Sequence, residues 1–183
     1  MPLVLVLGDI HIPHRAADIP AKFRKLLVPG KIDQILCTGN LIDAATLDYL
    51  KSITPQVSIA RGEFDEQQSY PISERLLVGG LSIGLVSGHL VPANGDVDTL
   101  AATARLLDVD ILVTGSTHRF EAYEEQGRFF INPGSITGAF GPLEPTPVPS
   151  FVLMEIKENV VAYVYQLVND EVVVDRIEYS KTD

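Results

Sequence analysis

Residues 3–11, with the sequence Leu3-Val4-Leu5-Val6-Leu7-Gly8-Asp9-Ile10-His11, decide how this chain folds. The first five are apolar on both faces of an extended chain, which is typical of a strand covered on both sides in a layered α/β sheet. Gly8 allows the backbone to turn where that strand ends. Asp9 and His11 would then lie beyond the carboxyl edge of the sheet, where open α/β folds place their sites. A carboxylate and an imidazole two residues apart can both reach one divalent metal ion.

Length and composition predict one domain over residues 1–183. The chain is 46% hydrophobic and 21% charged, which provides a substantial core and argues against extensive disorder. A formal net charge of -10 without a basic cluster argues against binding of nucleic acid or anionic membranes. The single cysteine, Cys37, cannot form an intrachain disulfide, which fits a reducing compartment. The apolar start is too short to span a membrane and lacks a signal peptide's charged leader, so we expect a cytosolic protein.

The order of the expected elements predicts two sheets. Up to residue 60, strands expected over residues 3–7, 32–37 and 56–60 alternate with helices over 18–28 and 44–52, which favours a parallel sheet with helical cover. Hairpins follow, with strands expected over residues 75–78, 81–86, 119–125, 128–131, 151–157, 160–168 and 171–179. A helix over 98–107 and a strand over 110–114 interrupt them, and Asp18 and Asp98 are expected to cap their helices. The sum is an α/β fold: a two-sheet α/β/β/α sandwich with helices on the outside.

Five glycine-containing turns follow the expected strands. They are Gly8-Asp9-Ile10-His11, Gly39-Asn40-Leu41-Ile42-Asp43, Gly62-Glu63-Phe64-Asp65, Ser87-Gly88-His89 and Gly115-Ser116-Thr117-His118. Their order and spacing resemble the calcineurin-like metallophosphoesterases, whose pattern is Gly-Asp-x-His, Gly-Asp-x-x-Asp, Gly-Asn-His-Asp, a His-Gly and Gly-His-x-His. The first motif alone arises readily by chance, whereas the ordered set is specific. The resemblance implies the two-sheet sandwich of the metallophosphoesterase type.

Further stretches narrow the resemblance to one family, and the likeness extends over essentially the whole chain. Among them are Leu26-Leu27-Val28-Pro29-Gly30-Lys31-Ile32, Ile35-Leu36-Cys37-Thr38-Gly39-Asn40-Leu41, Ile131-Asn132-Pro133-Gly134-Ser135 and Tyr163-Val164-Tyr165-Gln166-Leu167. These stretches are similar to the vacuolar protein sorting-associated protein 29 family, the small subunit of retromer. The resemblance implies a scaffold role in retrograde protein transport from endosomes to the Golgi or the plasma membrane.

The resemblance also implies which side chains would hold metal. Asp9, His11 and His118 match ligand positions of the phosphoesterase family. The other positions of the pocket carry substitutes, namely Asn40, Glu63, Ser87 and Ser116. Phe64 replaces the histidine that stabilises the transferring phosphoryl group. A neutral amide or hydroxyl is a poor ligand for zinc or manganese, and a two-metal phosphoesterase needs a full set of His and Asp ligands.

We therefore expect no catalytic residue in this pocket and at most one weakly bound divalent ion, zinc or manganese. Two alternatives stay open: a metal-dependent phosphoesterase with a degenerate site, and a single-metal structural site. Ser135 could suggest a nucleophile, but Asn132-Pro133-Gly134-Ser135 is not a nucleophile elbow and its residues are typical of a turn.

Without catalysis, the chain can still present surfaces to partners. By resemblance, one face binds the large α-solenoid subunit, vacuolar protein sorting-associated protein 35, through Ile12, His14, Leu41, Val91, Pro92 and Ala93. An apolar cluster at a rim is typical of a partner site, although loops also carry incidental apolar residues.

By the same resemblance, the opposite face would receive Rab GTPase-activating regulators in an apolar groove. The alternative is that the residues of this groove are plain core. They are Leu3, Leu26, Leu153, Tyr165 and Val174. Contact with the endosomal membrane would be peripheral and through the complex.

Overall fold

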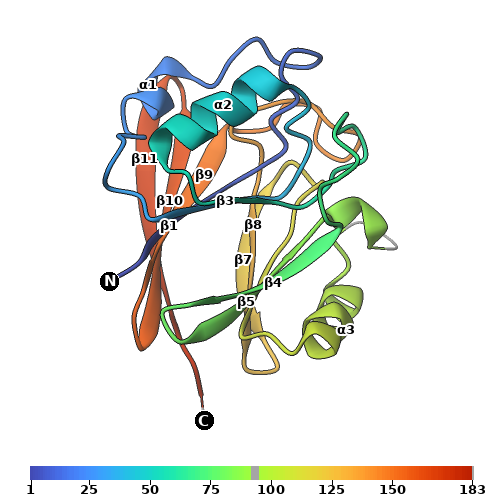
Figure 1. Cartoon of the computed structure of the whole chain (residues 1–183), viewed down its shortest axis with the longest axis vertical. Coiled ribbons are helices and arrows are strands. Elements are labelled where there is room, and N and C mark those ends of the chain that lie inside the picture. Colours follow the sequence, from blue (N-terminus) through green and yellow to red (C-terminus); the bar gives the residue numbers. More distant parts are fainter. Residues whose placement is uncertain (92–94, 183) are drawn as a thin grey trace.

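The computed structural model describes residues 1–91 and 95–182, whose strands form two sheets (Figure 1). The first sheet contains β1 (Leu3–Leu7), β2 (Gln34–Cys37), β3 (Val57–Ile59), β9 (Ser150–Ile156), β10 (Asn159–Val168) and β11 (Glu171–Ser180). Their order is β11-β10-β9-β1-β2-β3. The central strand β1 runs parallel to β2 and antiparallel to β9, so this sheet is mixed.

The second sheet is also mixed. It contains β4 (Ser73–Val78), β5 (Leu81–Val86), β6 (Ile111–Val113), β7 (Phe120–Glu125) and β8 (Arg128–Pro133), in the order β4-β5-β6-β8-β7. Strands β5, β6 and β8 are parallel, and β4 and β7 pair with this centre as antiparallel edge strands. The β4–β5 turn places Gly79 and Gly80 at φ values of 57° and 85°, a combination that suits glycine.

Strand β1 is apolar on both faces because it packs on both sides. Val4 and Val6 face the core between the two sheets, where they meet residues such as Ile111 and Val113. Leu5, like Leu7, faces the opposite way and packs under the helices α1 (Ala21–Arg24) and α2 (Ala44–Ile53). The alternation of side chains along a strand therefore divides one apolar run between two cores.

Helix α3 (Val97–Leu107) covers the outer face of the second sheet. Leu100 and Ala104 of this helix pack against Leu112 and Phe130.

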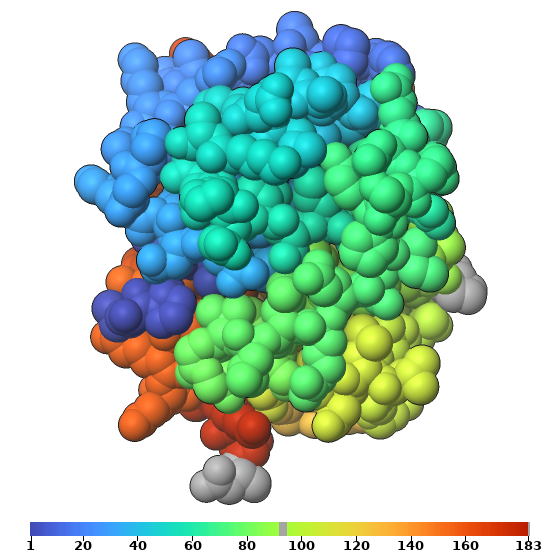
Figure 2. Space-filling view, viewed as in Figure 1, coloured from blue at the N-terminus to red at the C-terminus, as the bar shows by residue number. Residues whose placement is uncertain are grey.

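The helices lie at opposite ends of the molecule. Figure 1 shows α1 and α2 at one end and α3 at the other, and Figure 2 shows α2 and the β4–β5 hairpin on a single face. The predicted α/β/β/α sandwich is confirmed, with few helices and two mixed sheets. None of the helices in the described ranges has the length and apolar character needed to cross a membrane.

Two helix starts differ from the sequence prediction. Helix α3 is capped by Asp96 and not by Asp98, because the Asp96 carboxylate accepts from the Thr99 amide at 2.9 Å and the Thr99 hydroxyl at 2.7 Å. Asp18 caps nothing, because its carboxylate binds the Arg24 guanidinium at 2.6 and 2.8 Å. Helix α1 is short, since the amides of Leu26 and Leu27 bond three residues back instead of four.

Candidate functional site

Three buried side chains from the two sheets converge at the carboxyl ends of β1 and β6. Asp9 and His11 follow β1, and His118 follows β6. Their candidate metal-binding atoms, one carboxylate oxygen and one ring nitrogen from each histidine, all lie within 4.8 Å of one another. We call these three residues the ligand group. Over residues 1–91 and 95–182, no other set of three His, Cys, Asp or Glu side chains comes together in this way.

The turns that present the ligand group have left-handed backbones. The φ angle is 46° at Asp9, 49° at His11 and 59° at His118, and the neighbouring Asn40 and Ser116 have φ of 54° and 74°. A non-glycine residue in this region is strained by about 1–3 kcal/mol, so surrounding contacts must hold it there. Strain of this kind clusters at ligand and active sites.

Two glycines create the space in which these turns meet. A Cβ atom on Gly8 would lie 1.7 Å from Oγ1 of Thr38, and one on Gly115 would lie 2.4 Å from the same atom. The Thr38 side chain, directly after β2, therefore fills the gap between the turns that follow β1 and β6. Neither position has room for a larger residue, which explains the glycine at the start of both motifs.

Burial dominates the electrostatics of Asp9. Its carboxylate accepts from the Ser116 amide at 3.0 Å and from Asn40 Nδ2 at 3.4 Å, and it lies 4.0 Å from His118 Nε2. Desolvation raises the pKa of Asp9 above its ordinary value of 3.8, and the nearby His118 and the hydrogen bonds oppose this shift. A cation bound here would compensate the lost solvation of the carboxylate.

His11 is held in the neutral form. Burial lowers the pKa of His11 to about 3, and the neighbouring His118, Arg15 and His14 act in the same direction. The Nε2 atom of His11 is buried and has no hydrogen-bond partner among the described residues. A neutral imidazole with an unused ring nitrogen is the form that binds a metal ion.

The ligand group fits one divalent ion. Two imidazoles and a carboxylate are the ligand set of many zinc sites, and they leave one coordination position open. His118 Nδ1 donates to the Ala139 carbonyl at 2.6 Å, so Nε2 is the His118 nitrogen that faces Asp9. The unused Nε2 of His11 is the second nitrogen. A bound ion would supply Lewis-acid polarisation of whatever occupies the open position.

Asn40 and Ser116 lie beside the ligand group but act as hydrogen-bonding residues. Asn40 Nδ2 donates to Asp9, while Asn40 Oδ1 accepts from the Phe64 amide at 3.1 Å. Ser116 binds Asp9 through its backbone amide. The structure therefore brings both predicted pocket residues to the site, where they support Asp9.

Glu63 does not join the pocket, which corrects its predicted place there. Its side chain is exposed, because the turn that carries it directs the carboxylate of Asp65 inward instead. Asp65 accepts from the amides of Asn40, Ile42 and Gly62 at 2.9, 2.8 and 2.7 Å. Ser87 is buried, and its hydroxyl is paired with Nδ1 of His89.

Comparison with known proteins agrees with this geometry. The family model of the calcineurin-like phosphoesterase superfamily domain matches residues 3–159. The vacuolar protein sorting-associated protein 29 (Vps29) of Schizosaccharomyces pombe is 44% identical over 186 residues, which cover 99% of this chain and 100% of the relative. This chain belongs to the Vps29 family.

Solved Vps29 structures have the same fold. The crystal structure of Vps29 from Chaetomium thermophilum has a TM-score of 0.93 and 47% identity, with 100% of both chains covered. Vps29 from Entamoeba histolytica in complex with Zn2+ has a TM-score of 0.91 and 46% identity, with 96% of this chain and 98% of that chain covered.

Aromatic side chains line the rim of the Vps29 site. The Arg15 guanidinium lies 4.6 Å from the ring centre of Phe64 and 5.2 Å from that of Phe140, and it donates to the Phe140 carbonyl at 3.0 Å. The Phe64 ring meets the edge of His11 at a centroid distance of 5.6 Å. Phe140 was missed in the sequence, although an aromatic residue in a Gly/Pro-rich loop is the signal that could have found it. We call Arg15, Phe64 and Phe140 the rim cluster.

The residues expected to bind the large subunit are only partly at the surface. His14 is exposed and Ile12 is half-buried. Leu41 is only 1% exposed and packs in the core beneath the helices, and Val91 is buried against α3. These two predictions are therefore corrected, because neither side chain offers free surface. Two further positions, Pro92 and Ala93, lie outside the described residues.

Four of the five residues expected to form the regulator groove lie on the helix-covered face of the first sheet. Leu3, Leu153 and Tyr165 are half-buried beside the core under α1, and Tyr165 pairs with Val174 across β10 and β11. Val174 and Leu26 are exposed. These residues, Leu3, Leu26, Leu153, Tyr165 and Val174, form what we call the outer strip.

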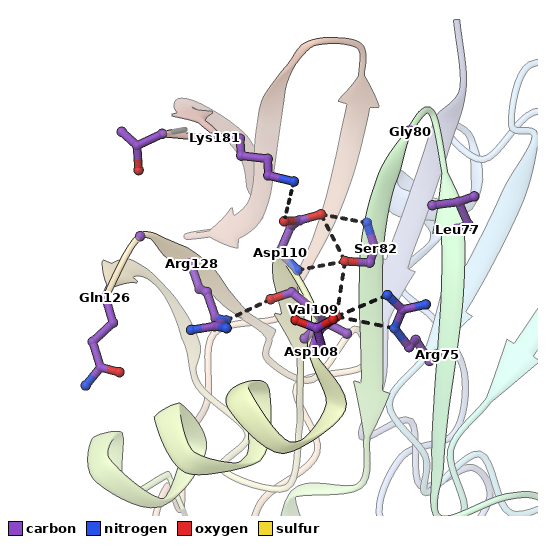
Figure 3. Close-up of a pocket in the computed structure, with 12 residues that line it drawn as sticks. Arg75, Leu77, Gly80, Ser82, Asp108, Val109, Asp110, Gln126, Arg128 and Lys181 are labelled. Atoms are coloured by element: carbon purple, nitrogen blue, oxygen red, sulfur yellow. Dashed lines mark hydrogen bonds and ion pairs between the residues drawn. The ribbon is translucent and has the colours of Figure 1, made fainter.

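A separate polar pocket of about 490 Å3 lies at the amino ends of β5, β6 and β8, away from the ligand group (Figure 3). Figure 3 shows Asp110 between Lys181 and Ser82, with Lys181 Nζ at 3.0 Å from the Asp110 carboxylate. Arg75 and Arg128 donate to the backbone carbonyls of residues 108 and 109. These contacts tie the strand ends and the C-terminal segment together, which is a structural role.

Proposed function

We propose that this chain is a non-catalytic scaffold subunit of retromer, with a vestigial phosphoesterase site that holds at most one divalent ion. The observation that carries the proposal is the single ligand group of Asp9, His11 and His118. A two-metal phosphoesterase needs a negatively charged ligand shared by both ions. Asn40, at the corresponding position, is neutral and is hydrogen-bonded to Asp9 and to the Phe64 amide.

Family membership supports the retromer assignment. The chain would act in retrograde protein transport on the cytosolic side of endosomes, recruited through its partners and not by its own membrane contact. The large α-solenoid subunit would cover the face that contains the ligand group. There His14, together with the rim cluster, offers exposed apolar and cationic surface suited to a packed interface.

The outer strip supports a second interface. Its residues belong to the first sheet and to the segment after α1, whereas the ligand group lies at the carboxyl ends of β1 and β6. A partly exposed apolar strip beside a sheet is suited to an extended segment with apolar anchors. We assign this strip to regulators such as Rab GTPase-activating proteins.

The rival function is a metal-dependent phosphoesterase, which the intact ligand group favours. The Zn2+ complex of Entamoeba histolytica Vps29 supports ion binding in the family, but a bound ion is not a reaction. In this chain Phe64 occupies the place of a phosphoryl-binding histidine and stacks with Arg15 over the site. With this arrangement, we expect a side chain of a partner protein, and not a phosphate ester, to occupy the open coordination position.

Zinc calorimetry and a phosphatase assay test the proposal together. We expect wild-type protein to bind one zinc ion and His118→Ala to lose that binding. His89→Ala is the matched control, since His89 pairs with Ser87 outside the ligand group. With manganese and an aryl phosphate, we expect no turnover above a blank. Turnover that His118→Ala abolishes would establish the phosphoesterase instead, and two bound ions would overturn the one-ion site.

A further inference from the structure

The loop of residues 135–139 runs directly beneath the ligand group. Three consecutive backbone carbonyls of the turn after β1 accept hydrogen bonds from this loop. The Ile136 amide donates to the Gly8 carbonyl at 3.2 Å, and the Ser135 hydroxyl donates to the Asp9 carbonyl at 2.7 Å. The Thr137 hydroxyl donates to the Ile10 carbonyl, also at 2.7 Å. The loop thus holds the left-handed segment that carries Asp9 and His11.

The same loop also holds the third member of the ligand group. The Ala139 carbonyl accepts from Nδ1 of His118 at 2.6 Å. Because a carbonyl oxygen can only accept, Nδ1 carries a proton, and Nε2 is the ring nitrogen that faces the site. Ala139 is fixed in turn by its amide, which donates to the Ser135 hydroxyl at 2.9 Å.

One hydroxyl therefore connects both halves of the site. Ser135 is fully buried, and its oxygen donates to the backbone of Asp9 while accepting from the residue that orients His118. Asp9 belongs to the end of the first sheet and His118 to the end of the second.

We propose that Ser135 is the positioning residue of the one-ion site: it fixes the Asp9 backbone and, through Ala139, the tautomer and orientation of His118. This inference rests on the proposed one-ion function. The Ser135 hydroxyl contacts the Asp9 carbonyl, the Ala139 amide and the Thr137 hydroxyl, and none of these is a candidate ligand atom. It acts on the two ligands from behind, as outer hydrogen-bond partners do at metal sites.

The test compares Ser135→Ala with Ser150→Ala. Ser150 is also fully buried, and its hydroxyl donates to the Pro133 carbonyl at 2.6 Å without touching a ligand-bearing residue. Both variants lose one buried hydroxyl–carbonyl bond, and Ser135→Ala also leaves the Ala139 amide without its acceptor, so a larger loss of stability is expected in Ser135→Ala. Zinc affinity should fall about tenfold or more in Ser135→Ala, the usual effect of removing an outer partner, and should stay unchanged in Ser150→Ala.

A metal-free measurement separates this inference from the proposed function. The nitrogen chemical shifts of the His118 ring in zinc-free protein report its tautomer. We expect the Nδ1-protonated form in wild type and in Ser150→Ala, and a mixture of tautomers in Ser135→Ala. If wild type binds no zinc, the ion site is absent while the scaffold function stands, and the tautomer measurement still decides whether Ser135 orients His118. An unchanged tautomer together with unchanged zinc affinity in Ser135→Ala would overturn the inference.

Thr137→Val provides a second variant in case Ser135→Ala does not fold. It removes the hydroxyl bond to the Ile10 carbonyl and keeps the shape of the side chain. Weaker zinc binding by Thr137→Val, with folding intact, would support the positioning role of the loop. Wild-type zinc affinity in this variant would count against it.

Discussion

The buried carboxylate of Asp65 holds the loop that follows β2. It accepts hydrogen bonds from three backbone amides, and these belong to Asn40, Ile42 and Gly62. Replacing Asp65 by Ala leaves three buried donors without their acceptor. We expect the free energy of unfolding to fall by about 3 kcal/mol, measured by urea denaturation.

Glu63→Ala is the matched control for Asp65→Ala. Glu63 lies two residues away in the same turn and is exposed, so we expect its replacement to change stability by less than about 0.5 kcal/mol. Equal losses in both variants would show that the carboxylate of Asp65 is not the anchor of this loop.

Single residues can be placed from the sequence where a motif fixes their spacing. The spacing in Gly8-Asp9-Ile10-His11 and Gly115-Ser116-Thr117-His118 placed three side chains that the structure brings within 4.8 Å. It failed for Glu63 and Leu41, because a motif does not tell which side chain of a turn points inward. It also missed the contacts of Ser135, since those depend on segments that are more than 100 residues apart in the chain.

Among the elements, α3 offers a direct test of a helix cap. The Asp96 carboxylate accepts from the Thr99 amide and hydroxyl, whereas Asp98 lies inside the first turn. Asp96→Ala should reduce the free energy of unfolding by about 1 kcal/mol, the usual effect of losing a cap. Asp98→Ala should reduce it by only about 0.3 kcal/mol, since it weakens the interaction with the helix dipole alone. The reverse order in thermal or urea unfolding would restore Asp98 as the cap.

Strand β11 allows the two faces of the first sheet to be tested separately. Val173 and Val174 are neighbours with 44% and 47% exposure, but their side chains point to opposite faces. Val174→Glu places a charge on the outer strip and should abolish binding of a Rab GTPase-activating regulator in a pull-down. Val173→Glu should preserve that binding, and both variants should keep wild-type stability to within about 0.5 kcal/mol. Loss of the regulator in both variants would argue against the outer strip.

Local signals fixed most strands but not the first helix. Gly79-Gly80 identifies the β4–β5 hairpin because both residues need positive φ angles. By contrast, Asp18 before an apolar pattern suggested a cap, and its carboxylate binds Arg24 instead. Only Phe23 of α1 is buried, so packing rather than local propensity decides how far this helix extends.

For the whole molecule, the assignment of partners to faces gives a reciprocal prediction. Phe140 is 54% exposed and belongs to the rim cluster, so Phe140→Asp should weaken binding of the large retromer subunit about tenfold or more while the regulator still binds. Leu77→Asp is the control, because Leu77 is 75% exposed and lies beside the polar pocket at the opposite strand ends. Calorimetry with purified partners measures both affinities. Equal effects of the two variants would refute the assignment of the rim cluster.

The layered architecture was predictable from the sequence because β1 is apolar on both faces and the strand–helix alternation stops near residue 60. Val4 and Leu5 point to opposite faces of β1 and are both apolar, so each face needs its own core, and the structure contains both cores. That residues 1–183 unfold as one domain remains a prediction. The sequence did not predict which apolar side chains lie at the surface, because exposure depends on which loop covers which side chain. Leu41 and Val91, which are both buried, illustrate this.

The ligand group joins the two layers of the sandwich. Asp9 and His11 extend from one sheet, and His118 extends from the other. An ion bound by all three would cross-link the two sheets and would close a loop of more than a hundred residues without a covalent bond. At a free concentration 100 times its dissociation constant, it would add about 2.7 kcal/mol to the folded state. The lifetime of the protein in a cell would then follow the supply of trace metal, and a chelator would shorten it without touching any partner.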